Sequence, residues 1–138
     1  MDPVKEPEGD DSITLYRGVS KSIKPSVLYD YAASGYAVPK GLVPDSPYPG
    51  GHENPDDHTM GDNYSIWTSW TTDKATAESF AKGPMGTDDG VVLQKNFSKS
   101  RFGKDIIQSD LSNVMQEGEW LVPGIQRTNN VKFIFGKR

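Results

Sequence analysis

YSIWTSWTTDKATAESFAKGP, residues Tyr64 to Pro84, is the stretch that decides the fold. Aromatic, β-branched and small hydroxyl residues fill its first part, which predicts a strand over Tyr64–Thr71 with one buried face. Asp73–Lys82 then has the pattern of a helix, with Thr72 or Asp73 as N-cap and Gly83-Pro84 as the stop. The residues expected to pack this helix against the sheet are Ala75, Ala77, Phe80 and Ala81.

The chain before this stretch predicts one strand and one helix. Ile13, Leu15 and Val19 alternate with polar or small residues in ITLYRGVS (Ile13–Ser20), the period-two pattern of a strand. Pro25–Gly35 opens with proline, has apolar residues at helical spacing and ends in glycine, which predicts a short amphipathic helix. Pro39–Asn63 is rich in proline and glycine and is expected to be a long loop on the substrate or partner side.

The chain after the central helix is mostly β. A flexible stretch, Gly83–Gly90, leads into short runs with strand character. These runs are VVLQKNF (Val91–Phe97), Asp105–Gln108, EGEWLVP (Glu117–Pro123) and VKFIF (Val131–Phe135). Two early helices and several later strands predict an α+β fold with a mixed or mostly antiparallel sheet assembly.

Length and composition set the outer limits on organisation and function. A chain of 138 residues fits one domain, placed at residues 12–138, after an acidic, proline-containing leader or linker stub at Met1–Asp11. The net charge of -4 disfavours a nucleic-acid partner, and the absence of cysteine excludes disulfides and thiolate chemistry. No apolar run approaches the ~20 residues of a membrane span, and no signal peptide is evident at the start.

Three local features could carry chemistry. Arg17 lies in mid-strand, where burial is costly unless its planar fork of donors meets a carboxylate or phosphate, and Gly18 beside it would allow close approach of a ligand. A solvent-facing arginine at a sheet edge explains the same residue without function. Ser69 and Thr71 flank Trp70, so the two hydroxyls share one strand face while the tryptophan points into the core.

The third feature is a pair of glutamates, Glu117 and Glu119, two positions apart on an extended segment. Their carboxylates would face the same side, which is unfavourable unless a cation or donor lies between them. A solvated acidic strand end is the plainer interpretation. Apolar residues follow at once in Trp120–Val122, which indicates that the strand enters the core.

An arginine in the first strand, an S-x-[ST] strand running into an Ala/Phe helix and a late E-x-E together resemble the arginine-serine-glutamate class of mono-ADP-ribosyltransferases. The resemblance covers about Ile13 to Phe135 and is to the cholera-toxin-type, arginine-specific branch. In particular it is to the compact C-terminal toxin domains of type VI secretion and Rhs polymorphic effectors. The chain reads S-W-T where the family reads S-T-S, so both hydroxyl positions remain and the middle residue differs.

The resemblance implies a fold of two packed, mostly antiparallel sheets around an NAD cleft, and a role for each matched residue. Arg17 would hold the NAD phosphates and ribose, and Ser69 or Thr71 would support the catalytic Glu119. Glu117 would select arginine as the acceptor. The expected NAD-contacting residues are Arg17, Gly18, Ser69, Trp70, Thr71, Phe80 and Glu119, and no metal is required.

Loops and aromatic rings complete the expected cleft. By position, Gln108–Gln116 matches the family's acceptor-recognition loop and Gly83–Gly90 its mobile loop over NAD. Four rings could stack on nicotinamide or adenine, although each is more often a core residue. These rings are Tyr16, Tyr64, Trp67 and Phe80.

The resemblance also implies a biology. A secreted bacterial toxin of this class acts in the cytoplasm of a target cell on an arginine of a target-cell protein, and an immunity protein blocks its active site in the producer. Three alternatives remain at this point: an NAD glycohydrolase that does not need Glu117, a catalytically silent binding module, and a nucleic-acid acceptor. A metal site built from His52, Glu53, Asp56, Asp57 and His58 is disfavoured, because the spacing matches no known site.

Overall fold

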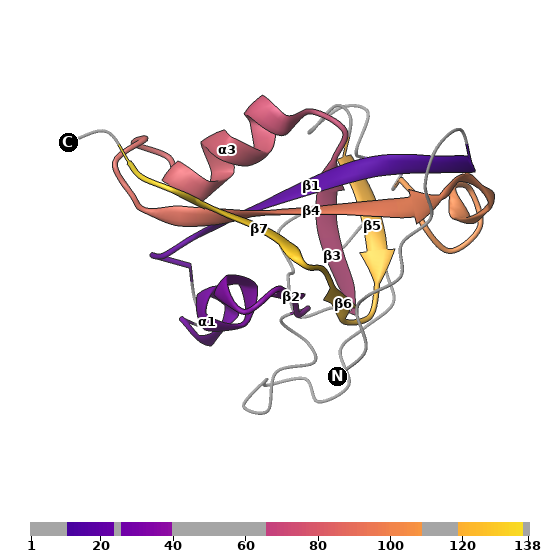
Figure 1. The fold of residues 1–138 in the computed structure, drawn as a ribbon, viewed down its shortest axis with the longest axis horizontal. Helices are drawn as coiled ribbons and strands as arrows, with labels where there is room; N and C mark the ends of the chain where they lie inside the picture. The colour runs from indigo at the N-terminus through magenta and orange to yellow at the C-terminus, as the bar shows by residue number, and fades with distance from the viewer. Residues whose placement is uncertain (1–10, 24–25, 40–65, 109–118, 137–138) are drawn as a thin grey trace.

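The computed structural model describes residues 11–23, 26–39, 66–108 and 119–136. Its centre is a five-stranded antiparallel sheet (Figure 1). The strands, in spatial order, are β5 (Glu119–Pro123), β3 (Trp67–Thr71), β1 (Ser12–Ser20), β4 (Gly90–Ser98) and β7 (Asn130–Ile134). A separate two-stranded antiparallel ladder joins β2 (Tyr36–Ala37) to β6 (Gln126–Arg127). The α+β class is confirmed.

Two α-helices lie on opposite sides of this sheet (Figure 1). The helix α3 (Lys74–Lys82) covers one side, and α1 (Val27–Ala33) lies on the other side together with the β2–β6 ladder. A short 3-10 helix, η3 (Lys99–Arg101), follows β4. No described helix is long and apolar enough to cross a membrane.

Strand alternation sends the residues of β1 to two different cores. Leu15 and Val19 are buried in the larger core, on the side of α1, together with Trp70. Tyr16, one position along, packs instead with the smaller core beneath α3, which contains Ala77 and Ala81. This alternation follows from the period of two in an extended chain. The sheet that contains β1 therefore separates the two cores.

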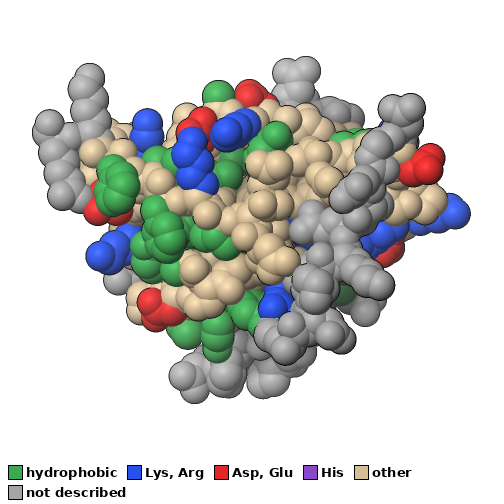
Figure 2. Space-filling view, in the orientation of Figure 1, with side chains coloured by type: hydrophobic (Ala, Val, Ile, Leu, Met, Phe, Trp, Pro, Cys, Tyr) green, Lys and Arg blue, Asp and Glu red, His purple; other side chains and the backbone are tan. Residues whose placement is uncertain are grey.

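The surface carries charges of both signs. Figure 2 shows lysine, arginine and acidic side chains intermingled over one face of the molecule, without a continuous field of either sign. Large apolar side chains that remain exposed are Phe80, Met85, Ile125, Phe133 and Phe135. This distribution agrees with the small net charge of the whole chain.

Most of the expected elements are present, with some corrections. The helix expected over Pro25–Gly35 is shorter, at Val27–Ala33, and Asp105–Gln108 forms no strand. Only isolated bridges occur in that run, from Ile106 to Phe102 and from Ile107 to Leu121. Of the two expected sheets, the second has only two strands.

Candidate functional site

A pocket of about 660 Å³ opens where β1 and β3 part. Strand β1 pairs with β4 along its whole length, from Ser12 to Ser20, but it pairs with β3 only at Tyr16 and Thr71. Beyond that pair the strands diverge, and α3 closes one side of the gap. The polar residues of the lining are Arg17, Ser20, Ser22, Ser69, Thr71, Thr76, Ser79 and Glu119, with Tyr16 and Trp67 among its aromatic ones.

Arg17 projects from β1 across this gap. Its Nη1 donates to the backbone carbonyl of Ser69 on β3 at 3.0 Å, so one fork of the guanidinium joins the two walls. Its Nε is buried and has no hydrogen-bond partner among the described residues. Burial lowers the pKa of Arg17 well below its usual value, to about 10, against the opposing attraction of the Glu119 carboxylate. A buried donor without an acceptor is costly, which makes the guanidinium of Arg17 a candidate group for binding a ligand that carries an acceptor.

Gly18 lines the pocket as well, but its immediate surroundings are not open. A Cβ at this position would collide with the backbone carbonyl of Ala77 and would crowd the backbone of Ala81, both in α3. The sequence interpretation attributed the glycine to ligand approach. The structure shows a packing requirement, because α3 can lie this close to β1 only where β1 has no side chain.

The S-W-T segment is divided as alternation predicts. Trp70 is buried, donates its indole Nε1 to Thr68 Oγ1 at 2.9 Å and packs edge-on against Phe97 with ring centroids 5.4 Å apart. Ser69 and Thr71 lie on the other strand face and line the pocket. The expected orientation of Trp70 into the core is confirmed, although Trp70 is also among the residues that line the pocket.

Thr71 and Ser69 make different hydrogen bonds. Thr71 Oγ1 accepts the backbone N–H of Asp73 at 3.0 Å, and Asp73 in turn caps α3 by accepting the N–H of Ala75. The threonine hydroxyl therefore helps to shape the turn from β3 into α3. Ser69 contributes its backbone carbonyl, which accepts a hydrogen bond from Arg17 Nη1.

Glu119 stands at the first position of β5, directly opposite Thr71. Its side chain is only 5% exposed, yet it borders the pocket. Leu121 and Val122, which follow it, are fully buried and anchor β5 in the core. Tyr16, Thr71 and Glu119 thus form one row across three adjacent strands, which fixes the backbone of Glu119 in the sheet.

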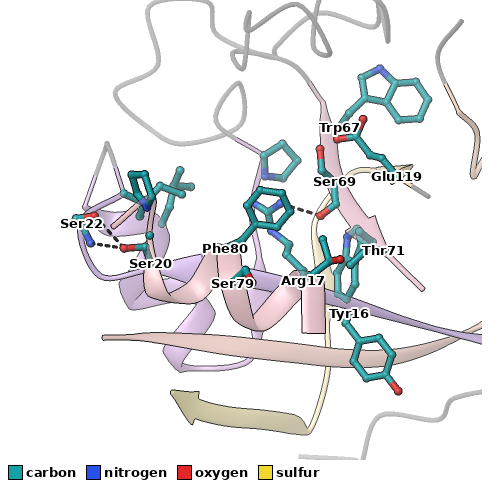
Figure 3. A pocket seen from close by; sticks show the side chains of 18 residues that line it. Tyr16, Arg17, Ser20, Ser22, Trp67, Ser69, Thr71, Ser79, Phe80 and Glu119 are labelled. Atoms are coloured by element: carbon teal, nitrogen blue, oxygen red, sulfur yellow. Dashed lines mark hydrogen bonds between the residues drawn. The ribbon is translucent and has the colours of Figure 1, made fainter. Parts of the chain in front are cut away.

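The stick view shows how these side chains are spread along the pocket (Figure 3). Ser20 and Ser22 lie at one end, Trp67 and Glu119 lie at the other, and Arg17 lies between them. Cavities of several hundred Å³ accommodate ligands of cofactor size. The pocket is therefore elongated and has chemically different ends.

Phe80 was expected to pack the helix against the sheet, and that part of the prediction is wrong. The buried face of α3 consists of Ala77 and Ala81, whereas Phe80 is 50% exposed at the pocket and Ala75 is exposed. A step of 100° per residue carries Phe80 off the buried face, to the side where its ring can meet a ligand. Tyr16 and Trp67 also line the pocket.

Sequence reasoning missed the end of the pocket that contains Ser20 and Ser22. Both hydroxyls donate to Asp88 Oδ2, at 2.9 Å and 2.7 Å respectively. Asp88 belongs to the stretch Gly83–Gly90, which was expected to be a mobile cover. The only local signal was two serines flanking a lysine at a strand end, and their acid partner is distant in sequence.

Several expected features lie outside the described residues. They are Glu117, Tyr64, the loop up to Asn63 with its histidines and acids, and most of Gln108–Gln116. Within the described part of the chain, no group of three or more His, Asp or Glu could hold a metal ion.

Comparisons of the chain with protein-family models, with curated proteins and with solved structures give no match.

Proposed function

We propose that this protein is an arginine-specific mono-ADP-ribosyltransferase, which transfers ADP-ribose from NAD to an arginine of a target protein and releases nicotinamide. The observation that carries the proposal is the convergence of Arg17, Ser69 and Glu119 on one pocket. These residues come from three strands far apart in sequence. Their types were matched to this chemistry from the sequence alone, and their meeting in one cavity supports that match.

Arg17 is suited to the diphosphate of NAD. Its Nε is a buried donor with no partner among the described residues, while Nη1 is used to hold the side chain in place. A diphosphate oxygen would supply the missing acceptor and would also offset the cost of burying the guanidinium. Lysine offers a point charge in place of a fixed fork and would serve poorly.

Glu119 is suited to the reacting end of the dinucleotide. Cleavage of the bond to nicotinamide generates positive charge on the ribose, in an oxocarbenium-like transition state. A buried carboxylate fixed in a sheet stabilises that charge without having to reorganise at the moment of reaction. Ser69 and Thr71 are the hydroxyls on the neighbouring strand that border the same cavity.

Glu117 is the residue on which the choice of acceptor depends. A guanidinium is protonated in water and is therefore a poor nucleophile. A second carboxylate beside Glu119 would orient the acceptor arginine and help to remove its proton as the new bond forms. An NAD glycohydrolase has no such requirement, because water is its acceptor.

The proposal extends to the biological setting. A bacterial effector of this kind acts on a protein in the cytoplasm of the target cell, and the producing cell needs an immunity protein that covers the NAD pocket. Net charge and the E-x-E pair favour a protein acceptor over a nucleic acid.

Labelled NAD tests the proposal directly. The wild-type chain, Glu119→Gln and Glu117→Gln are incubated with NAD labelled in the adenosine half, with agmatine as a small guanidinium acceptor and with a bacterial lysate. Glu78→Gln is the matched control, because Glu78 lies on α3 outside the pocket and faces Lys132 at 3.9 Å. We expect labelled agmatine and labelled protein bands with the wild type and the control only.

Each other outcome indicates a different activity. Release of nicotinamide without labelled acceptor, which persists in Glu117→Gln and is lost in Glu119→Gln, would identify a glycohydrolase. Binding of NAD without turnover would leave a binding module. If the wild type neither binds NAD nor consumes it, the proposed function is wrong.

A further inference from the structure

The two ends of the pocket present different chemistry, and this difference bears on which dinucleotide it accepts. The reasoning rests on the proposed function, which places nicotinamide ribose near Glu119 and the diphosphate at Arg17. Figure 3 shows Ser20 and Ser22 at the opposite end from Glu119, with Arg17 between. The base at the other end of the dinucleotide would therefore lie beside the two serines.

The protons of these serines are already used. Asp88 Oδ2 accepts from Ser20 Oγ at 2.9 Å and from Ser22 Oγ at 2.7 Å, and these two hydrogen bonds lower the pKa of Asp88. An ionised carboxylate can only accept, so both hydroxyls must be the donors. The 2.9 Å separation of the two hydroxyl oxygens follows from their sharing a single acceptor.

What remains on the serines is acceptor capacity. Ser20 Oγ uses one further lone pair to accept the backbone N–H of Ser22 at 3.1 Å. Ile23 lies at the same end, because its backbone N–H donates to the Ser20 carbonyl at 3.1 Å, and it belongs to one apolar cluster with Leu28; both residues line the pocket. An apolar wall beside hydroxyl acceptors suits a flat ring that carries an N–H donor on its edge.

We propose that Ser20 and Ser22, positioned by Asp88, make this end of the pocket selective for an amino-substituted purine, that is, for adenine rather than hypoxanthine. Adenine presents an exocyclic amino group, which can donate to a serine oxygen. Hypoxanthine presents a carbonyl oxygen at the same place and an N–H only on the neighbouring ring nitrogen, so a serine oxygen that accepts from the adenine amino group would face a second acceptor, which is repulsive. Ser20 and Ser22 are then specificity-determining residues, and Asp88 is a positioning residue.

Equilibrium binding of NAD and of nicotinamide hypoxanthine dinucleotide tests this proposal, with turnover of both as a second readout. The proteins are the wild type, Ser20→Ala with Ser22→Ala, and Asp88→Asn, whose amide can donate as well as accept. The control replaces Ser98 and Ser100, a second pair of exposed serines two residues apart with oxygens 2.9 Å apart, outside the pocket.

We expect the wild type and the control to prefer NAD about fivefold to tenfold, the value of one hydrogen bond at a partly exposed site. The double alanine variant should bind the two dinucleotides within about twofold, mainly because NAD binds less tightly. Asp88→Asn should also reduce the preference for NAD over the hypoxanthine dinucleotide, because an amide at this position no longer holds the hydroxyl protons of Ser20 and Ser22 in one orientation. Circular dichroism checks that the variants remain folded.

The failures of the two proposals are distinguishable. Equal binding of the two dinucleotides by a wild type that turns over NAD would overturn the selectivity and leave the proposed function intact. An undiminished preference in the double alanine variant would also overturn it. Absence of any dinucleotide binding would overturn both.

Discussion

Replacing Arg17 with methionine should make the protein more stable and remove its binding of NAD. Methionine keeps an unbranched apolar side chain of similar reach and removes the charge. In the free protein the guanidinium lowers the free energy of unfolding, because its Nε is buried without a partner among the described residues. If Arg17 is present for a ligand, its removal should improve the unliganded fold.

The size of the effect can be worked out from the pKa. A pKa lowered by burial to about 10 means that the charge costs on the order of 3 kcal/mol in the folded protein, with the attraction of Glu119 already included. Loss of the hydrogen bond from Nη1 to the Ser69 carbonyl removes about 1–2 kcal/mol of stabilisation. Arg17→Met should therefore raise the free energy of unfolding by about 1–2 kcal/mol.

Urea denaturation with and without NAD measures both halves of the prediction. The pKa of Arg17 in the folded state lies below its unfolded value, so its destabilising charge is present at neutral pH and is lost as the pH rises through about 10. The gain in unfolding free energy of Arg17→Met over the wild type should therefore shrink as the pH rises above about 10. Arg101→Met is the control, because Arg101 pairs with Asp105 at the surface at 2.9 Å and should change little. A fall in stability of more than ~1 kcal/mol in Arg17→Met would show that Arg17 is a structural cation and refute the reasoning.

Three further predictions concern the walls of the pocket. Gly18→Ala should lower the free energy of unfolding by about 1–3 kcal/mol, because its Cβ meets the carbonyl of Ala77, and unchanged urea denaturation would contradict this. Asp73→Ala should lower Tm by uncapping α3. The pKa of Asp73 is lowered chiefly by the hydroxyl of Thr76 and next by the N–H of Ala75. The stabilisation by this cap should therefore be lost as the pH falls below 3.8, and the Tm values of the wild type and of Asp73→Ala should converge there. Phe80→Ala should change the free energy of unfolding by less than about 0.5 kcal/mol, because the ring is half exposed. The same variant should bind NAD about threefold to tenfold more weakly in a titration. Equal affinity of the variant and the wild type for NAD would show that the ring does not contact the dinucleotide.

The elements that the sequence predicted well are those in which local signals agree. In β1, alternation placed Leu15 and Val19 in the core, and both are buried. In α3, Asp73, one of the two predicted N-cap candidates, and the stop at Gly83, which has a φ of 76°, coincide with the observed ends of the helix. These signals depend on a few neighbouring residues, so the chain itself contains them.

The features that could not be predicted depend on which segments meet. The role of Gly18 is set by the approach of α3, and the hydroxyl protons of Ser20 and Ser22 are taken by an aspartate more than sixty residues away. Helical periodicity alone could not say which of the apolar residues of α3 would face the pocket. Phe80 was assigned to packing for that reason and proves half exposed.

The pocket exists because one strand pairing is left incomplete. Strand β1 is held to β4 by a continuous ladder, while its contact with β3 is reduced to the pair Tyr16–Thr71. Had the ladder between β1 and β3 continued, the gap that Arg17 crosses would be closed by backbone hydrogen bonds, and its guanidinium would have no cavity to enter. The fold thus pairs β1 fully with β4 and leaves its pairing with β3 open, and the guanidinium of Arg17 spans this opening. Its Nη1 donates to the carbonyl of Ser69, while its Nε has no partner among the described residues. If the proposed function is right, the buried Arg17 raises the energy of the unliganded protein and would lower that of the complex with NAD, as expected of a residue kept for binding rather than for folding.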